Sequence, residues 1–151
     1  MDAYRADRSA EPTVDAKRLW AGGAATALVA GLTAAVGLLL VRDVLGIPVI
    51  TSALQLGNSQ VTTIVGHAIV AALIATALLH LLILTTPRAT TFFGWICILA
   101  TITAALWPFT VSATLAAKIG SGTIHLVVGI AIYSLLSGVA ATATRPGRPG
   151  R

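Results

Sequence analysis

The sequence predicts an all-α fold, an integral membrane antiparallel four-helix bundle, and two observations carry this prediction. First, only 10% of the 151 residues are charged and 56% are hydrophobic, whereas a soluble domain carries about 25% charged residues. The charges lie in the first 18 residues, in the last seven, and at Arg42, Asp43, Arg88 and Lys118. Second, these charges separate four apolar runs that can cross a hydrocarbon core of about 30 Å as helices.

The first predicted helix covers residues 19–41 and ends at Arg42 and Asp43. Residues 1–18 before it are polar and of mixed sign, which predicts a flexible tail. A cleavable signal peptide is the alternative, because basic residues precede the apolar run. The run is longer than the usual apolar part of such a signal, and no small-residue cleavage site precedes Arg42. We therefore expect a membrane helix.

The connection 42–60 is the longest between predicted helices. Gly46-Ile47-Pro48 interrupts any helix, and Gly57-Asn58-Ser59 indicates a turn before the second predicted helix, residues 61–84. The connection is more apolar than an ordinary loop. We expect part of it to lie along the membrane interface or to fold back over the helix ends.

The third predicted helix covers residues 92–116. Phe92 to Trp107 is too short to span the membrane, so the helix is expected to continue past Pro108, which should kink it. Lys118 and a turn at Gly120-Ser121-Gly122 then lead to the fourth predicted helix, residues 123–141. The basic, Pro/Gly-rich residues 142–151 are predicted to be a disordered tail.

The basic residues predict the orientation of the chain. Four spans place both tails and the middle loop on one side of the membrane, with eight of the ten Lys and Arg residues. Arg42 and Lys118 lie on the other side. Because cytoplasmic loops are enriched in Lys and Arg, we expect both termini in the cytoplasm and the protein in the plasma membrane.

Small residues recur at every fourth position of the first predicted helix, at Gly23, Ala27, Gly31 and Ala35. This pattern produces a smooth face against which another helix packs closely. The partner is either a helix of the same bundle or a second copy of the chain, and packing within the bundle is the ordinary case.

The predicted spans contain no Asp, Glu, Lys or Arg well inside the membrane. This argues against proton-coupled carriers, which need a membrane carboxylate, and against metal sites built from Glu and His on facing helices. The single cysteine, Cys97, excludes a thiol–disulfide oxidoreductase and is expected to be a buried packing residue. The sequence therefore predicts no catalytic residue, no metal ligand and no cofactor.

The polar residues that remain are grouped toward the outer side of the membrane. His67 and His125 are expected at the same level, with Trp107, Arg42 and Asp43 nearby, whereas His80 lies near the cytoplasmic end of its helix. These five residues form the candidate ligand-binding site. The alternative is that the histidines bond only to backbone carbonyls, serines or lipid headgroups.

Three features of the sequence belong together: RLWAGGAATALVAGLTAAVGLLLVRDVLGIPV at residues 18–49, Pro108, and IHLVVGIAIYSLL from Ile124. In these features the chain resembles a family of small four-helix membrane proteins from actinobacteria, a domain of unknown function. The resemblance implies the same fold and topology, and it brings no established activity. Among the histidines, it implies His125 as the shared position.

We expect a non-enzymatic integral membrane protein with an accessory or structural role. The first alternative is a protein that binds a small molecule, lipid or quinone in an outer-leaflet pocket covered by the 42–60 connection. The second is an electron carrier with one haem between His67 and His125. The expected partners are the lipid bilayer and either a second copy or another membrane protein. Nucleic acid is not expected, because the basic residues flank the apolar spans.

Overall fold

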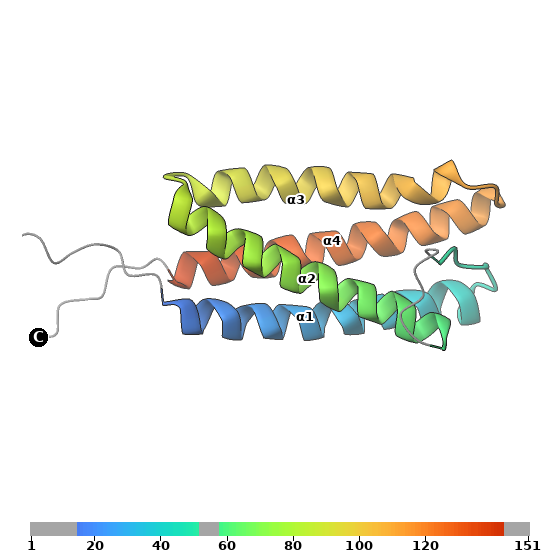
Figure 1. The fold of residues 1–151 in the computed structure, drawn as a ribbon. Helices are drawn as coiled ribbons and strands as arrows, with labels where there is room; N and C mark the ends of the chain where they lie inside the picture. The colour runs from blue at the N-terminus through green and yellow to red at the C-terminus, as the bar shows by residue number, and fades with distance from the viewer. Residues whose placement is uncertain (1–14, 52–57, 144–151) are drawn as a thin grey trace, which may run out of the picture.

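A computed structural model describes residues 15–51 and 58–143, and this part of the chain is helical and contains no strand (Figure 1). It has four α-helices and two short helical turns of other types, one after the first helix and one after the third. The elements are α1 (Ala16–Leu39), the π-helical turn η2 (Leu40–Val44), α2 (Gln60–Thr85), α3 (Ala89–Leu106), the 3₁₀ turn η3 (Trp107–Thr110) and α4 (Leu115–Ala143). The predicted all-α four-helix fold is confirmed.

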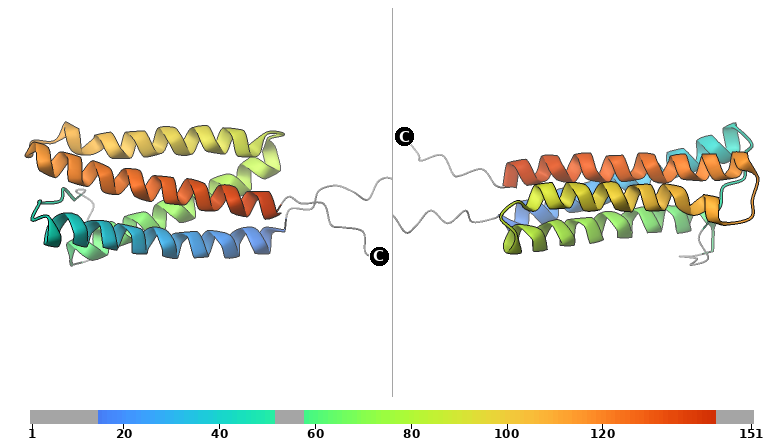
Figure 2. Two further views of the ribbon diagram at one scale, coloured as in Figure 1. Left: turned by 180° about the vertical axis from the view of Figure 1, so that it is seen from behind. Right: turned by 90° about the horizontal axis from the view of Figure 1, so that it is seen from above.

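All four helices are long and apolar enough to cross a membrane, as four spans between Ala16 and Ala143. By this criterion the chain is a multi-pass membrane protein. α1 begins and α4 ends at the same end of the bundle, which we call the terminal end (Figures 1 and 2). The opposite end, with η2 and η3, is the distal end.

The helices do not run strictly parallel to one another. α2 crosses the bundle diagonally, from the side of α3 at the terminal end to the side of α1 at the distal end (Figure 1). α2 and α3 therefore diverge toward the distal end, with α4 behind the space between them.

The small residues of α1 pack within the bundle. Gly23, Ala27 and Gly31 are buried, and Gly23 lies directly against the side chain of Thr76 in α2. A Cβ atom at Gly31 would lie 3.1 Å from Ile69 of α2. The smooth face predicted from the sequence is thus the face on which α2 crosses α1, as expected for close helix packing in lipid.

The bounds of the third helix differ from those predicted. α3 begins at Ala89, and the span Ala89–Thr110 is complete after 22 residues. The chain leaves the helix after η3 instead of continuing to residue 116. Because the helix starts earlier than predicted, it needs no continuation to residue 116, and the expected kink at Pro108 is replaced by the 3₁₀ turn η3 that ends the span.

The predicted turn at Gly120-Ser121-Gly122 lies inside α4, and all three residues are buried. These glycines permit close approach between elements. A Cβ atom at Gly122 would lie 2.8 Å from the carbonyl oxygen of Ala105 in α3, and one at Gly120 would lie 2.7 Å from Val41 in η2. The fourth helix therefore starts at Leu115, before the predicted residue 123.

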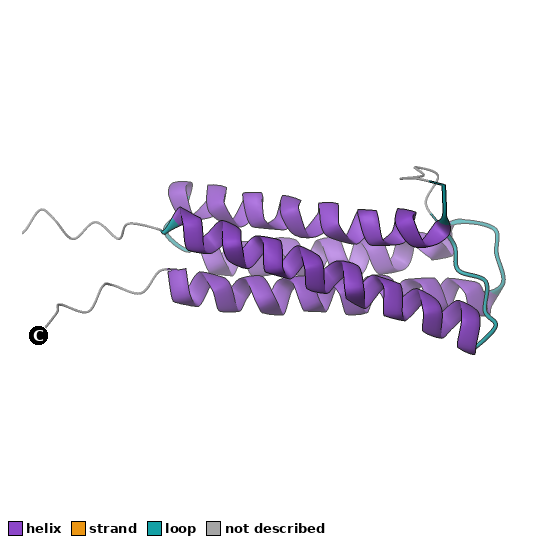
Figure 3. Ribbon diagram, turned by 90° about the horizontal axis from the view of Figure 1, so that it is seen from below, coloured by secondary structure: helices purple, strands orange, loops and turns teal. Residues whose placement is uncertain are grey.

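The connection after η2 folds back across the distal end, shown in teal in Figure 3. Gly46 has φ of +65°, a left-handed conformation that favours glycine, and Ile47 N donates to Val41 O at 2.9 Å. We call residues 47–51 the cover segment. Of the predicted tails and loop, residues 1–14, 52–57 and 144–151 lie outside the described part of the chain.

The cover segment is attached at two points. Ile50 N donates to Ser121 Oγ in α4 at 2.8 Å, and this serine is fully buried. At the other point, Gln60 Nε2 at the start of α2 donates to Val49 O at 2.8 Å and to Thr51 Oγ1 at 3.0 Å. Two backbone groups of the cover segment, which have no helical partners, are satisfied in this way.

Candidate ligand-binding cavity

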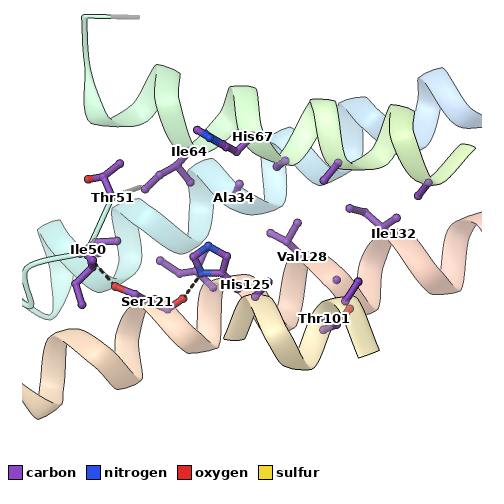
Figure 4. Close-up of a pocket in the computed structure, with 18 of the residues that line it drawn as sticks. Ala34, Ile50, Thr51, Ile64, His67, Thr101, Ser121, His125, Val128 and Ile132 are labelled. Atoms are coloured by element: carbon purple, nitrogen blue, oxygen red, sulfur yellow. Dashed lines mark hydrogen bonds between the residues drawn. The ribbon is translucent and has the colours of Figure 1, made fainter. Parts of the chain in front are cut away.

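A cavity of about 330 Å³ lies between α2, α3 and α4, under the cover segment (Figure 4). It occupies the region where α2 and α3 diverge. On α4 its wall extends from Ser121 to Ile132, which corresponds to about 16 Å at 1.5 Å per residue. The cavity is therefore elongated along the bundle, from just below the cover segment toward the middle of the span.

Short side chains explain why this space is not filled. Besides Ala34 of α1, five alanines of α2 and α3 line the cavity: Ala68, Ala71, Ala75, Ala100 and Ala104. Their spacing of three or four residues places them on one face of each helix. Methyl side chains are too short to meet across the gap between the diverging helices, so a cavity remains where larger residues would close the packing.

One side of the cavity is open. Ala71, Ala100 and His125 line it and are exposed, although they lie on three different helices. The opening is therefore lateral, between α2 and α3, at a depth where a membrane protein contacts lipid. The cover segment closes the distal end through Val49, Ile50 and Thr51.

Two histidines face the cavity from different helices, His67 from α2 and His125 from α4 (Figure 4). Each is bonded to the backbone one turn earlier. His125 Nδ1 lies 2.7 Å from Ser121 O, and His67 Nδ1 lies 2.7 Å from Thr63 O. A carbonyl oxygen only accepts, so Nδ1 donates in both rings. In the neutral ring, Nε2 is then the acceptor.

The other three predicted site residues lie outside the cavity lining. Arg42 Nε contacts Asp43 Oδ1 at 2.8 Å, and Arg42 Nη1 donates to Gln60 Oε1 at 3.2 Å. These residues support the second attachment of the cover segment rather than line the cavity. Trp107 lies in η3 and is exposed.

Sequence reasoning missed Thr101 and Ser121, which also line the cavity. Thr26, Thr76 and Thr103 each bond to a carbonyl one turn earlier in their own helix. The Thr101 hydroxyl makes no such bond within residues 15–51 and 58–143, and it packs against Gly129 of α4. The sequence feature that could have indicated a cavity is the repeated spacing of alanines in α2 and α3.

His80 lies away from the cavity, toward the terminal end of α2. Its Nδ1 atom is buried and has no hydrogen-bond partner among residues 15–51 and 58–143, and its ring lies 6.5 Å from that of Trp20 in α1. It takes no part in the cavity. Within the described ranges, no three His, Cys, Asp or Glu residues are grouped as a metal site requires.

The comparison with known proteins identifies a family. A family model described as "Family of unknown function (DUF6069)" matches residues 14–142. The chain belongs to this family. No curated protein and no solved structure matches the chain. Every residue that lines the cavity, from Ala34 to Ile132, lies within the part of the chain that matches DUF6069.

Proposed function

We propose that this DUF6069 protein is a non-enzymatic protein of the plasma membrane that binds a small, largely apolar molecule in the cavity between α2, α3 and α4. The cavity itself is the observation that supports this function best. Small-molecule sites typically enclose about 300–1,000 Å³ with apolar walls and a few placed polar groups. The volume of about 330 Å³, the alanine walls and the two histidines match this description.

A purely structural or accessory role explains the cavity less well. Protein interiors are packed nearly as densely as organic crystals, and a bundle under selection for packing alone fills such a space with larger side chains. Here the alanines of α2 and α3 leave the space open on the lipid side, while two hydrogen-bonded attachments hold a cover over its distal end.

The polar groups in the cavity are suited to binding rather than to catalysis. The described lining contains no Asp or Glu, so neither histidine has a carboxylate there to orient it as a general base. Cys97 at the wall is buried. Nδ1 of His125 already donates to a carbonyl, which fixes the ring and makes Nε2 the acceptor of the neutral ring.

The shape of the cavity favours a slim ligand over a flat macrocycle. Its volume is at the lower end of the range for small-molecule sites, and its long dimension follows the helices. We therefore expect the protein purified from its own membrane to be colourless. A Soret absorption band that disappears in a His125→Phe variant would favour the haem carrier instead.

The excess of basic residues around the tails and the middle loop supports the orientation that belongs to this proposal, with both termini in the cytoplasm. In this orientation the cavity opens into the outer half of the bilayer. The ligand is then a molecule that is present in, or passes through, the outer leaflet.

Native mass spectrometry of protein gently extracted from its own membrane tests the proposal. We expect a defined non-protein mass to co-purify with the wild-type chain. Ala71→Phe should remove that mass, because Ala71 lines the cavity, whereas Ala77→Phe should keep it, because Ala77 is an exposed alanine of α2 outside the lining. A bare chain, or equal retention by both variants, contradicts the proposal.

A further inference from the structure

We propose that the molecule bound in the cavity is an uncharged lipid with a hydroxyl group at its polar end, and that His125 Nε2 accepts a hydrogen bond from this hydroxyl. This inference rests on the proposed function and specifies the class of ligand. Three observations lead to it: the absence of charge in the described lining, the fixed donor of His125, and the shape of the cavity.

The described lining excludes a charged headgroup. It contains no Lys, Arg, Asp or Glu. Of the two distal basic residues, Arg42 is paired with Asp43 and bonded to Gln60, and Lys118 lies outside the lining. An anionic phosphate in this apolar cavity would lack a counter-charge, which is costly in a low-dielectric environment. The headgroup is therefore neutral.

The hydrogen bond of His125 to its own helix requires that the polar group of the ligand be a hydrogen-bond donor. Because Nδ1 donates to Ser121 O at 2.7 Å, the neutral ring presents the Nε2 lone pair to the cavity. An ester or ketone oxygen only accepts, and it would meet this lone pair without forming a bond. A hydroxyl group donates to it.

The geometry also places the two ends of the ligand. Ser121 holds the cover segment through its hydroxyl and His125 through its carbonyl, so the polar position lies directly below the cover (Figure 4). From there the wall continues through Val128 to Ile132, toward the middle of the bundle. A polar end near the membrane surface and an apolar chain toward the midplane is the orientation of an ordinary membrane lipid.

The test compares three probes with one chain and different heads: farnesol, farnesyl methyl ether and farnesyl monophosphate. Competition with radiolabelled farnesol is measured for the full-length protein in phosphatidylcholine nanodiscs. We expect the wild-type protein to bind farnesol about fivefold more tightly than the ether, as for the loss of one neutral hydrogen bond. The phosphate should bind more weakly still. Equal binding of alcohol and ether, or tightest binding of the phosphate, overturns the inference.

Two variants test whether His125 causes the preference for the alcohol over the ether. His125→Phe should reduce the alcohol-over-ether preference to about onefold, and His80→Phe should leave it unchanged, because His80 lies outside the cavity. A preference that survives in His125→Phe contradicts the role of His125. The wild-type comparison needs no variant to fold. If the wild-type protein binds none of the probes, the proposed function fails as well; if alcohol and ether bind equally, only this inference fails.

Two natural sources of a hydroxyl head are then distinguished with dioctanoylglycerol and a decyl hydroquinone. Binding of either at least as tight as that of farnesol, and weakened by His125→Phe, supports the inference and identifies the source as a diacylglycerol or a quinol. Weaker binding of both than of farnesyl methyl ether contradicts it.

Discussion

Replacing Gly122 by alanine tests how closely α3 and α4 pack beside the cavity. Gly122 is buried in α4, and an added Cβ atom would lie 2.8 Å from the carbonyl oxygen of Ala105 and 3.4 Å from the ring of Phe109. The nearer atom belongs to the backbone of α3, so no side-chain rotation relieves the contact. The two helices must move apart instead.

Two opposing effects determine how much Gly122→Ala changes the free energy of unfolding. Alanine is favoured over glycine inside a helix by about 1 kcal/mol, whereas inserting a methyl group into a packed contact costs about 1–3 kcal/mol. Gly138 of the same helix is the matched control, because an added Cβ there meets nothing within 4 Å. Gly138→Ala should keep the helix-propensity gain. We therefore expect Gly122→Ala to be less stable than Gly138→Ala by about 1–3 kcal/mol.

Denaturant unfolding of both variants in the same detergent micelles, followed by far-ultraviolet circular dichroism, measures this difference. A common detergent keeps the solvent of the apolar surface constant, so the comparison depends on the two positions alone. If Gly122→Ala is as stable as Gly138→Ala or more stable, the close approach of α3 and α4 at Ala105 is refuted.

Two further predictions concern the cover segment and the orientation. Ser121→Ala should lower the free energy of local opening at Ile50 by about 1–3 kcal/mol, because the Ile50 N–H loses its acceptor. Hydrogen exchange at the Ile50 amide measures this free energy. An unchanged exchange rate argues against the attachment. In a Cys97→Ala background, a membrane-impermeant maleimide should label Thr114→Cys in intact cells and Lys17→Cys only after lysis. The reverse labelling pattern would show that the termini lie outside the cell, and would refute the proposed orientation.

The four spans were predictable because length and hydropathy alone decide which segments cross a bilayer. The role of Gly120 and Gly122 was not, because glycine serves both turns and close helix contacts. Both glycines lie in α4, and only the positions of Val41 and Ala105, which come from other parts of the chain, show that they serve close helix contacts. Pro108 was similarly ambiguous, since a proline near the end of a span either kinks the helix or ends it.

For the candidate site, sequence reasoning gave the level in the membrane but not the face of each helix. His67 and His125 were expected at one depth, and both line the cavity. Trp107 and Arg42 were also expected near that depth, yet they lie outside the lining. The location of the cavity depends on the divergence of α2 from α3, which follows from how α2 crosses α1. A crossing angle is a property of two packed surfaces, and one helix pattern does not contain it.

The lateral opening of the cavity determines which measure of concentration governs its occupancy. A lipid that moves from the bilayer into the cavity exchanges one apolar environment for another, so the hydrophobic effect contributes little to the transfer. In the proposed binding mode, the fit to the alanine walls and a hydrogen bond from the ligand to His125 decide between competing lipids. Occupancy follows the mole fraction of the ligand among the surrounding lipids, not its concentration in water. A site of this kind responds to the composition of the membrane itself.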